Sequence, residues 1–204
     1  MNGFFSVTVF EKEGEAVVEA CGEKYRLTLA DLERIGVADG AEADSDSLNL
    51  LAAAHEKLLC IKKALVYLSY KGYATRALGQ KLRRGGFPAD TVDEVLELLV
   101  RKGYLDDEAL CKEYATALQR SKGYGPLRIK KELYAKGFER EQIETAVEEL
   151  EETPVEVITA ILVKKFPSLH PDDRQARAKA VAYLSSRGYD YDDINNAISA
   201  LERE

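Results

Sequence analysis

The sequence predicts a mainly α-helical protein made of three tandem three-helix repeats, preceded by a small β-rich module. Three observations predict this class. One segment recurs at a fixed offset, the chain after residue 48 has helical periodicity to its end, and the first 30 residues instead carry short runs rich in Val and Phe. Repeats at a fixed period are typical of stacked arrays, which are usually binding surfaces rather than catalytic pockets.

The repeated segment reads LRRGGFPADTVDEVLELL at 82–99, LYAKGFEREQIETAVEEL at 133–150 and LSSRGYDYDDINNAISAL at 184–201. Successive copies are 51 residues apart (133 − 82 and 184 − 133), and three columns keep this offset: Leu82, Leu133 and Leu184; Gly86, Gly137 and Gly188; Phe87, Phe138 and Tyr189. We expect each glycine to end the second helix of its repeat in the left-handed conformation, which a residue with a Cβ adopts less readily. The aromatic ring that follows would pack beneath this turn.

The N-terminal module is predicted to contain three short strands at 4–10, 15–20 and 24–29, because Val and Phe dominate there and glycines mark the turns. A short helix is predicted at 30–35, ending at Gly36. Residues 38–49 are acidic and small, which is the composition of a hinge or loop. Since a three-stranded meander is marginally stable alone, we expect it to pack on another element.

From Leu48 onward the first repeat is predicted to form a helix to about Lys71, a second helix over 75–84 and a third helix that begins near Pro88. The apolar stripe of the first helix is predicted to include Leu51, Leu58, Leu59, Leu65 and Val66. The later copies repeat this plan, with the second helix of the last copy at 178–186. The predicted domains are therefore the β-rich module with its acidic linker at 1–47 and the three repeats at 48–104, 105–152 and 153–204.

Charge is unevenly distributed along the chain, whose formal net charge is −7. Residues 1–54 carry −7, residues 57–137 carry +8 and residues 138–204 carry −7, and Glu56 supplies the remaining −1. A basic middle between acidic ends favours a field directed at a polyanion or at an acidic groove of a protein. The low pI argues against tight, nonspecific DNA binding as the main task.

Several classes of protein are not expected. The longest apolar run is far short of the ~20 residues that cross a bilayer, and the N-terminus has no secretory leader, so we expect a cytoplasmic protein with no membrane partner. Cys60 and Cys111 are 51 residues apart, so we expect them to fill the same buried position in successive repeats, and we expect Cys21 to be a small core residue as well.

Catalytic and metal-binding motifs are also lacking in the sequence. Neither His55 nor His170 has another His or a Cys three or four residues away. We interpret Asp106-Asp107 as a helix N-cap rather than a metal site. We therefore expect no enzyme activity, no metal and no cofactor.

The segment SKGYGPLRIKK at 121–131 is the strongest candidate contact site. Its glycines, aromatic ring, helix start and cations could hold an anion, or could be an ordinary turn with solvated cations. Pro126 removes one N–H and weakens the first reading, whereas Tyr124, flanked by glycines and poorly placed for core packing, favours a contact role. The second helix of the first repeat has similar basic character, while the third copy offers only Arg174, Arg177 and Lys179. The candidate partner-binding residues are Arg76, Lys81, Arg83, Arg84, Arg120, Lys122, Tyr124, Arg128, Lys130, Lys131 and Lys136.

Two stretches of the chain closely resemble the RecX family, bacterial regulators of the RecA recombinase. They are ALVYLSYKGYATRALGQKLRRGGF at 64–87 and GYLDDEALCKEYATALQRSKGYGPLRIKKELYAKGF at 103–138, and the second carries the more specific pattern. The chain departs from the family where Lys71, Ala74 and Ala77 stand near positions that commonly hold Arg, Ser and Glu.

The resemblance implies an elongated, curved array of the three repeats. It also implies a noncatalytic regulator that binds along the groove of RecA filaments on DNA and suppresses ATP hydrolysis, strand exchange and co-protease activity. We expect the RecA filament as the partner, weak DNA contact at most, and a monomer. The alternative is a protein that binds nucleic acid directly through the basic face of its repeats; a scaffold for some other acidic protein is a third reading.

Overall fold

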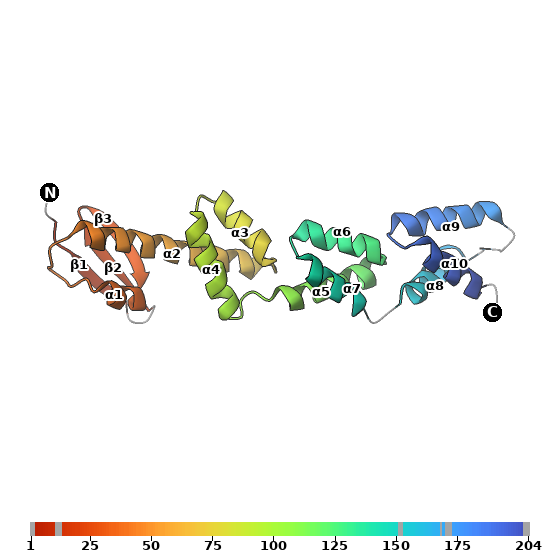
Figure 1. The fold of residues 1–204 in the computed structure, drawn as a ribbon, viewed down its shortest axis with the longest axis horizontal. Helices are drawn as coiled ribbons and strands as arrows, with labels where there is room; N and C mark the ends of the chain where they lie inside the picture. Colours follow the sequence, from red (N-terminus) through yellow and green to blue (C-terminus); the bar gives the residue numbers. More distant parts are fainter. Residues whose placement is uncertain (1–2, 11–13, 151–152, 168, 170–172, 202–204) are drawn as a thin grey trace. The chain divides into compact units, whose positions relative to one another are not determined.

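The computed structural model describes residues 3–10, 14–150, 153–167, 169 and 173–201. Along the chain these form β1 (Ser6–Phe10), β2 (Glu15–Ala20), β3 (Glu23–Thr28), α1 (Leu29–Ile35), α2 (Ser45–Tyr70), α3 (Thr75–Arg84), α4 (Ala89–Arg101), α5 (Asp107–Lys122), α6 (Pro126–Lys136), α7 (Arg140–Glu148), α8 (Pro154–Lys165), α9 (Arg174–Ser186) and α10 (Tyr191–Leu201) (Figure 1). They divide into two compact units, Met1–Gly72 with Leu78–Leu105, and Tyr73–Ala77 with Asp106–Glu204.

In the first unit, the three strands form an antiparallel meander in the order β1-β2-β3, as predicted. Val7 pairs with Val18, which pairs in turn with Tyr25. One face of the sheet is buried: Val18 and Leu27 are fully covered and pack in one cluster with Leu51 of α2. The expectation that the meander packs on another element is therefore confirmed.

Helix α2 begins earlier than predicted. The Asp44 carboxylate caps it by accepting a hydrogen bond of 2.8 Å from the amide of Ser47, so residues 45–49 of the predicted acidic loop are helical. The predicted stripe was also wrong in part, because Leu59 and Val66 are 43% and 48% exposed. The helix instead buries Leu51, Ala54, Leu58, Cys60 and Ala64. The helix packs on β3 and on α4, so its buried residues contact two different neighbours and do not form one narrow stripe.

The glycine turn after the second helix of each repeat is confirmed. All three glycines have the left-handed conformation, with φ of +97° at Gly86, +97° at Gly137 and +89° at Gly188. In each turn the amide of the following aromatic residue donates to the carbonyl of the leucine five positions earlier: Phe87 to Leu82, Phe138 to Leu133 and Tyr189 to Leu184, at 3.3 to 3.4 Å. This bond satisfies a carbonyl that the helix end would otherwise leave without a partner.

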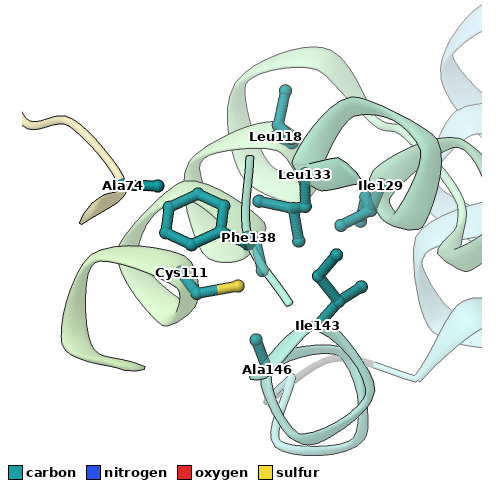
Figure 2. Packing of buried hydrophobic residues seen from close by; sticks show 9 residues of the cluster. Ala74, Cys111, Leu118, Ile129, Leu133, Phe138, Ile143 and Ala146 are labelled. Carbon is teal, nitrogen blue, oxygen red and sulfur yellow. The ribbon is translucent and has the colours of Figure 1, made fainter. Parts of the chain in front are cut away.

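The core of the second repeat is formed by all three of its helices (Figure 2). Leu133 and Ile143 are fully buried, and the ring of Phe138 lies beneath the turn as expected. Ala74, from the segment just before α3, belongs to the same cluster and is 2% exposed. An apolar side chain suits this buried position.

The third repeat has its own core, in which Ile158, Leu162, Leu184 and Ile194 are buried. Its second helix begins four residues before the predicted start because the Asp173 carboxylate caps α9 at Arg174.

The predicted cysteine column is also present. Cys60, Cys111 and Leu162 share the 51-residue offset, and their exposed fractions are 0%, 0% and 1%. Cys21 does not fit the prediction of a core residue, because it lies in the tight turn between β2 and β3 with φ of +52° and is exposed.

Candidate protein-interaction surface

The candidate cations on α3 stand on a helix without any acidic residue. Arg83 and Arg84 are exposed, whereas the Lys81 stem is half-buried and its ammonium lies 4.2 Å from the centre of the Tyr67 ring. Arg83 pairs with Asp93 of the neighbouring α4. Among the described residues, Arg84 is therefore the exposed cation at the end of this helix for which the structure shows no carboxylate partner.

The cations at the start of α3 and on α6 are mostly paired with carboxylates of the same unit. Arg76 lies 3.8 Å from Glu139, and Arg128 contacts Glu132 at 2.9 Å, one turn further along α6. A further pair, Lys130 with Glu144, lies between α6 and α7. Exposed pairs contribute little to stability, about 0–1 kcal/mol, but they lower the net charge that a polyanion would meet.

Lys130 donates a hydrogen bond of 2.6 Å to the Glu144 carboxylate. This bond holds the pKa of Glu144 below its usual range, because it favours the ionised carboxylate. Lys131, by contrast, is exposed beside this pair, and Lys136 lies with its ammonium 4.0 Å from the centre of the Tyr114 ring. The face of α6 thus mixes a solvated cation with neutralised ones.

The turn between α5 and α6 differs from both readings of the sequence. Gly123 ends α5 in the left-handed conformation, after the exposed Arg120 and Lys122. Tyr124 is half-buried and packs against the core of the second repeat, so the expectation that its ring avoids core packing was wrong. Its other face remains near cations, with the Lys122 ammonium 5.5 Å and the Arg128 guanidinium 5.3 Å from the ring centre.

The helix start at Pro126 is not an open phosphate cradle. The amide of Leu127 donates to the carbonyl of Gly188 at 3.1 Å, and the amide of Arg128 donates to the carbonyl of Gly125 at 3.1 Å. The backbone donors that would hold an anion at a helix N-terminus are therefore already used.

The structure adds Arg187 to the candidates, a residue that the sequence reasoning missed. Arg187 caps the C-terminus of α9, and its guanidinium lies 5.8 Å from the centre of the Tyr124 ring. The signal was present in the sequence, because Arg187 follows Lys136 by the repeat offset (187 − 136 = 51). The predicted cations of the third copy, Arg174, Arg177 and Lys179, are earlier on the same helix.

Over the described ranges, no three His, Cys, Asp or Glu side chains are grouped so that they could hold a metal ion. His55 has a structural role: its Nδ1 accepts a hydrogen bond of 2.9 Å from the amide of Arg26 on the edge strand β3. His170 lies outside the described residues. Asp106 caps α5 through the amide of Ala109, which confirms the N-cap prediction.

No helix in the described part of the chain is both long enough and apolar enough to cross a bilayer.

Three family models match the chain in order. They describe the first three-helix domain of RecX over residues 60–99, the second over 106–147 and the third over 151–198. The regulatory protein RecX of Pseudomonas fluorescens is 30% identical over 73% of this chain and 96% of its own length. That of Pseudomonas savastanoi is 33% identical over 68% of this chain and 88% of its own length.

A solved structure has a similar fold. A crystal structure of regulatory protein RecX aligns with a TM-score of 0.78 and 19% identity, covering 97% of this chain and 99% of its own. At this identity the likeness concerns the fold alone, and it extends over nearly the whole chain, the N-terminal module included.

Proposed function

Because the chain belongs to the RecX family of regulatory proteins, we propose that it is a noncatalytic regulator of RecA that binds the RecA–DNA filament along its groove and inhibits its ATPase, strand-exchange and co-protease activities. The observation that carries this proposal is the presence of all three RecX three-helix domains, in order, between residues 60 and 198. Repeated units suit a repeating target, because several weak contacts add up without one deep pocket.

The contacts of the candidate cations support a protein partner over the alternative, direct binding of nucleic acid. Arg76, Arg83, Arg128 and Lys130 each have a carboxylate partner within 4 Å. A surface that alternates in sign matches a protein surface with defined charges better than a continuous row of phosphates, whose affinity grows with the number of uncompensated cations.

The test is the ATPase rate of RecA filaments on single-stranded DNA, with and without this protein. We expect the rate to fall with increasing protein and to saturate near a fixed ratio to RecA. A rate that does not change at any ratio, with a folded protein, would contradict the proposal.

Two neutralising variants map the surface in the same assay. Arg84→Gln and Lys131→Gln each remove an exposed cation for which, among the described residues, the structure shows no carboxylate within ion-pair distance. These variants leave the ion pairs of Arg128 and Lys130 intact, whereas reversing the charge of Arg128 or Lys130 would place two like charges side by side. We expect each to weaken inhibition about three- to tenfold, which corresponds to about 0.7 to 1.4 kcal/mol. Lys164→Gln, at an exposed position of α8, is the matched control and should leave inhibition unchanged.

A further inference from the structure

A polar pocket lies between the second and third repeats, within the second unit. It has a volume of about 450 Å³ and is lined by Ser121, Lys122, Tyr124, Arg128, Ser186 and Arg187. The first four residues come from the end of α5 and the start of α6, and the last two from the end of α9. The pocket therefore exists only where the two repeats meet.

Backbone contacts fix the two walls of this pocket. The amide of Gly125 donates to the carbonyl of Arg187 at 2.9 Å, and the amide of Leu127 donates to that of Gly188 at 3.1 Å. The Tyr189 hydroxyl donates to the carbonyl of Gly123 at 3.3 Å. With main chain bonded to main chain on both sides, the pocket is formed before any ligand arrives, which lowers the entropic cost of binding.

The cations of the pocket converge on one aromatic ring. Lys122, Arg128 and Arg187 lie 5.5, 5.3 and 5.8 Å from the centre of Tyr124. The Arg187 guanidinium also lies 4.9 Å from the Tyr183 ring and donates to the carbonyl of Lys122. The rings and this hydrogen bond hold the guanidinium in place at the rim of the pocket.

The charge in the pocket is only partly compensated. Glu132 pairs with Arg128 at 2.9 Å. Within the described part of the chain, neither Lys122 nor Arg187 has a carboxylate within ion-pair distance. The Ser121 and Ser186 hydroxyls donate to carbonyls of their own helices, so the charged donors of the pocket that no described carboxylate neutralises are Lys122 and Arg187. Two neighbouring cations without a described carboxylate partner would bind one anionic group in this pocket.

We propose that the pocket receives a single carboxylate side chain of the protein partner, held by Lys122 and Arg187. The inference rests on the proposed function, and it makes the third repeat part of the contact surface. A carboxylate fits better than a phosphate backbone because Glu132 of α6 pairs with Arg128 in the pocket, and Glu144 of α7 pairs with Lys130 of α6. A strand of phosphates that ran along α6 would meet these like charges. Arginine binds carboxylates in a defined planar geometry, which adds specificity.

The experiment compares Lys122→Gln and Arg187→Gln with Lys179→Gln, an exposed cation on α9 outside the pocket. Binding is measured to RecA filaments on single-stranded DNA and to the same DNA alone. We expect each pocket variant to lose about tenfold in affinity for the filament, equivalent to 1.4 kcal/mol. The control should stay within twofold, and affinity for DNA alone should not change.

Loss of the Arg187 hydrogen bond could disturb folding in Arg187→Gln. Lys122→Gln then still tests the proposal, because among the described residues the structure shows no hydrogen bond or ion pair for the Lys122 side chain, only the contact with the Tyr124 ring. Unchanged filament binding by both folded variants would overturn the pocket while leaving the proposed function standing. An equal loss on DNA alone would also overturn it, in favour of a phosphate.

If the wild-type protein does not bind filaments at all, the proposed function fails and the pocket is tested separately. Titration with hexaglutamate, followed by the NMR signal of the Arg187 Nε–H, should then shift this signal, whereas hexaglutamine should not. Absence of a shift with hexaglutamate, or equal shifts with both peptides, would reject the carboxylate pocket.

Discussion

The backbone of Gly188 lies so close to the backbone of Arg128 that a Cβ added to Gly188 would come within 2.3 Å of the Arg128 amide nitrogen. On the opposite side of the same contact, a Cβ on Gly125 would lie 2.5 Å from the carbonyl oxygen of Gly188. Two glycines therefore allow the second and third repeats to meet main chain to main chain, which is what forms the walls of the pocket.

This contact predicts an order among three glycine-to-alanine variants. Gly86, Gly137 and Gly188 share the left-handed conformation, so adding a Cβ to any of them lowers the free energy of unfolding by about 1–2 kcal/mol. A Cβ on Gly86 would have no described atom within 4 Å. A Cβ on Gly137 would lie 3.3 Å from the side chain of Ala77, and a Cβ on Gly188 would lie 2.3 Å from the backbone of Arg128. We expect the loss of unfolding free energy to rise in that order, with Gly188→Ala costing at least about 1 kcal/mol more than Gly86→Ala. Urea unfolding followed by circular dichroism measures it, and equal costs would mean that the close approach is not present in solution.

A second prediction concerns Asp107, whose carboxylate accepts hydrogen bonds from the Thr75 amide at 2.9 Å and from the Thr75 hydroxyl at 3.0 Å. Thr75 is the first residue of α3, so Asp107 acts as an N-cap supplied from another helix. Asp107→Ala should reduce the unfolding free energy by about 1 kcal/mol, in the range of a lost N-cap. Asp90→Ala, at an exposed acid in the first turn of α4, is the control and should cost less than half as much. Hydrogen exchange should show faster exchange at the start of α3 in the first variant only.

Local rules predicted much of this fold because they act within one helix or turn. Helix α3 has the predicted bounds of 75 and 84, since it begins after a glycine-tyrosine break and ends at Gly85-Gly86, and the three glycine turns recur as the offset requires. The failures come from tertiary context. Leu59 and Val66 fit a helical stripe but are exposed, because α2 packs on a strand and on α4 in turn, and periodicity carries no information about how many neighbours a helix has.

The candidate surface shows the same limit. The sequence identified the cations of α3 and α6, but several of their carboxylate partners lie outside the cation's own helix, such as Asp93 for Arg83 and Glu144 for Lys130. The sequence prediction for the third repeat considered only the cations within its second helix and so missed Arg187. The repeat offset of 51 residues from Lys136 nevertheless indicates this position. Which cations remain unpaired depends on packing, and only the structure identifies Lys122 and Arg187 as such within the residues it describes.

The cysteines offer a chemical test of the repeat packing. Cys60 and Cys111 are fully buried, and burial raises the pKa of each thiol to about 11, because the charged thiolate is disfavoured away from water. Cys21 is exposed in its turn. Iodoacetamide at pH 8 should therefore alkylate Cys21 rapidly and leave the other two unmodified until the protein unfolds, as read by mass spectrometry of the peptides. Labelling of Cys111 at the rate of Cys21 in the native protein would contradict the core of the second repeat.

The same thiols give stability a defined dependence on pH. Because the pKa of each thiol is higher in the folded protein than in the unfolded chain, the unfolded chain loses its protons first as pH rises. The stability that the two thiols contribute is therefore complete below the unfolded pKa of 9.0 and is lost as pH rises towards 11. By pH 10 the loss should be roughly 1 kcal/mol for each thiol. Comparing urea unfolding at pH 8 and pH 10 for the wild type and for the Cys60→Ala/Cys111→Ala variant isolates this term from other alkaline effects, and the variant should fall less steeply. Parallel curves would show that the thiols are not buried as described.

The final prediction separates regulation through a protein partner from direct nucleic-acid binding. Arg76, Arg83, Arg128 and Lys130 are paired to carboxylates, so these four cations of the candidate surface cannot neutralise phosphates while their pairs stay closed. Binding to single-stranded DNA without RecA should therefore be no tighter than the nonspecific range, with Kd of about 10⁻⁶ M or weaker at physiological salt, and affinity should fall only gradually as salt increases. Fluorescence anisotropy of a labelled oligonucleotide from 50 to 200 mM salt measures both quantities. Nanomolar binding with a steep loss over that interval would mean that the ion pairs open on DNA and that the basic faces track phosphates, which would reverse the preference between the two functions.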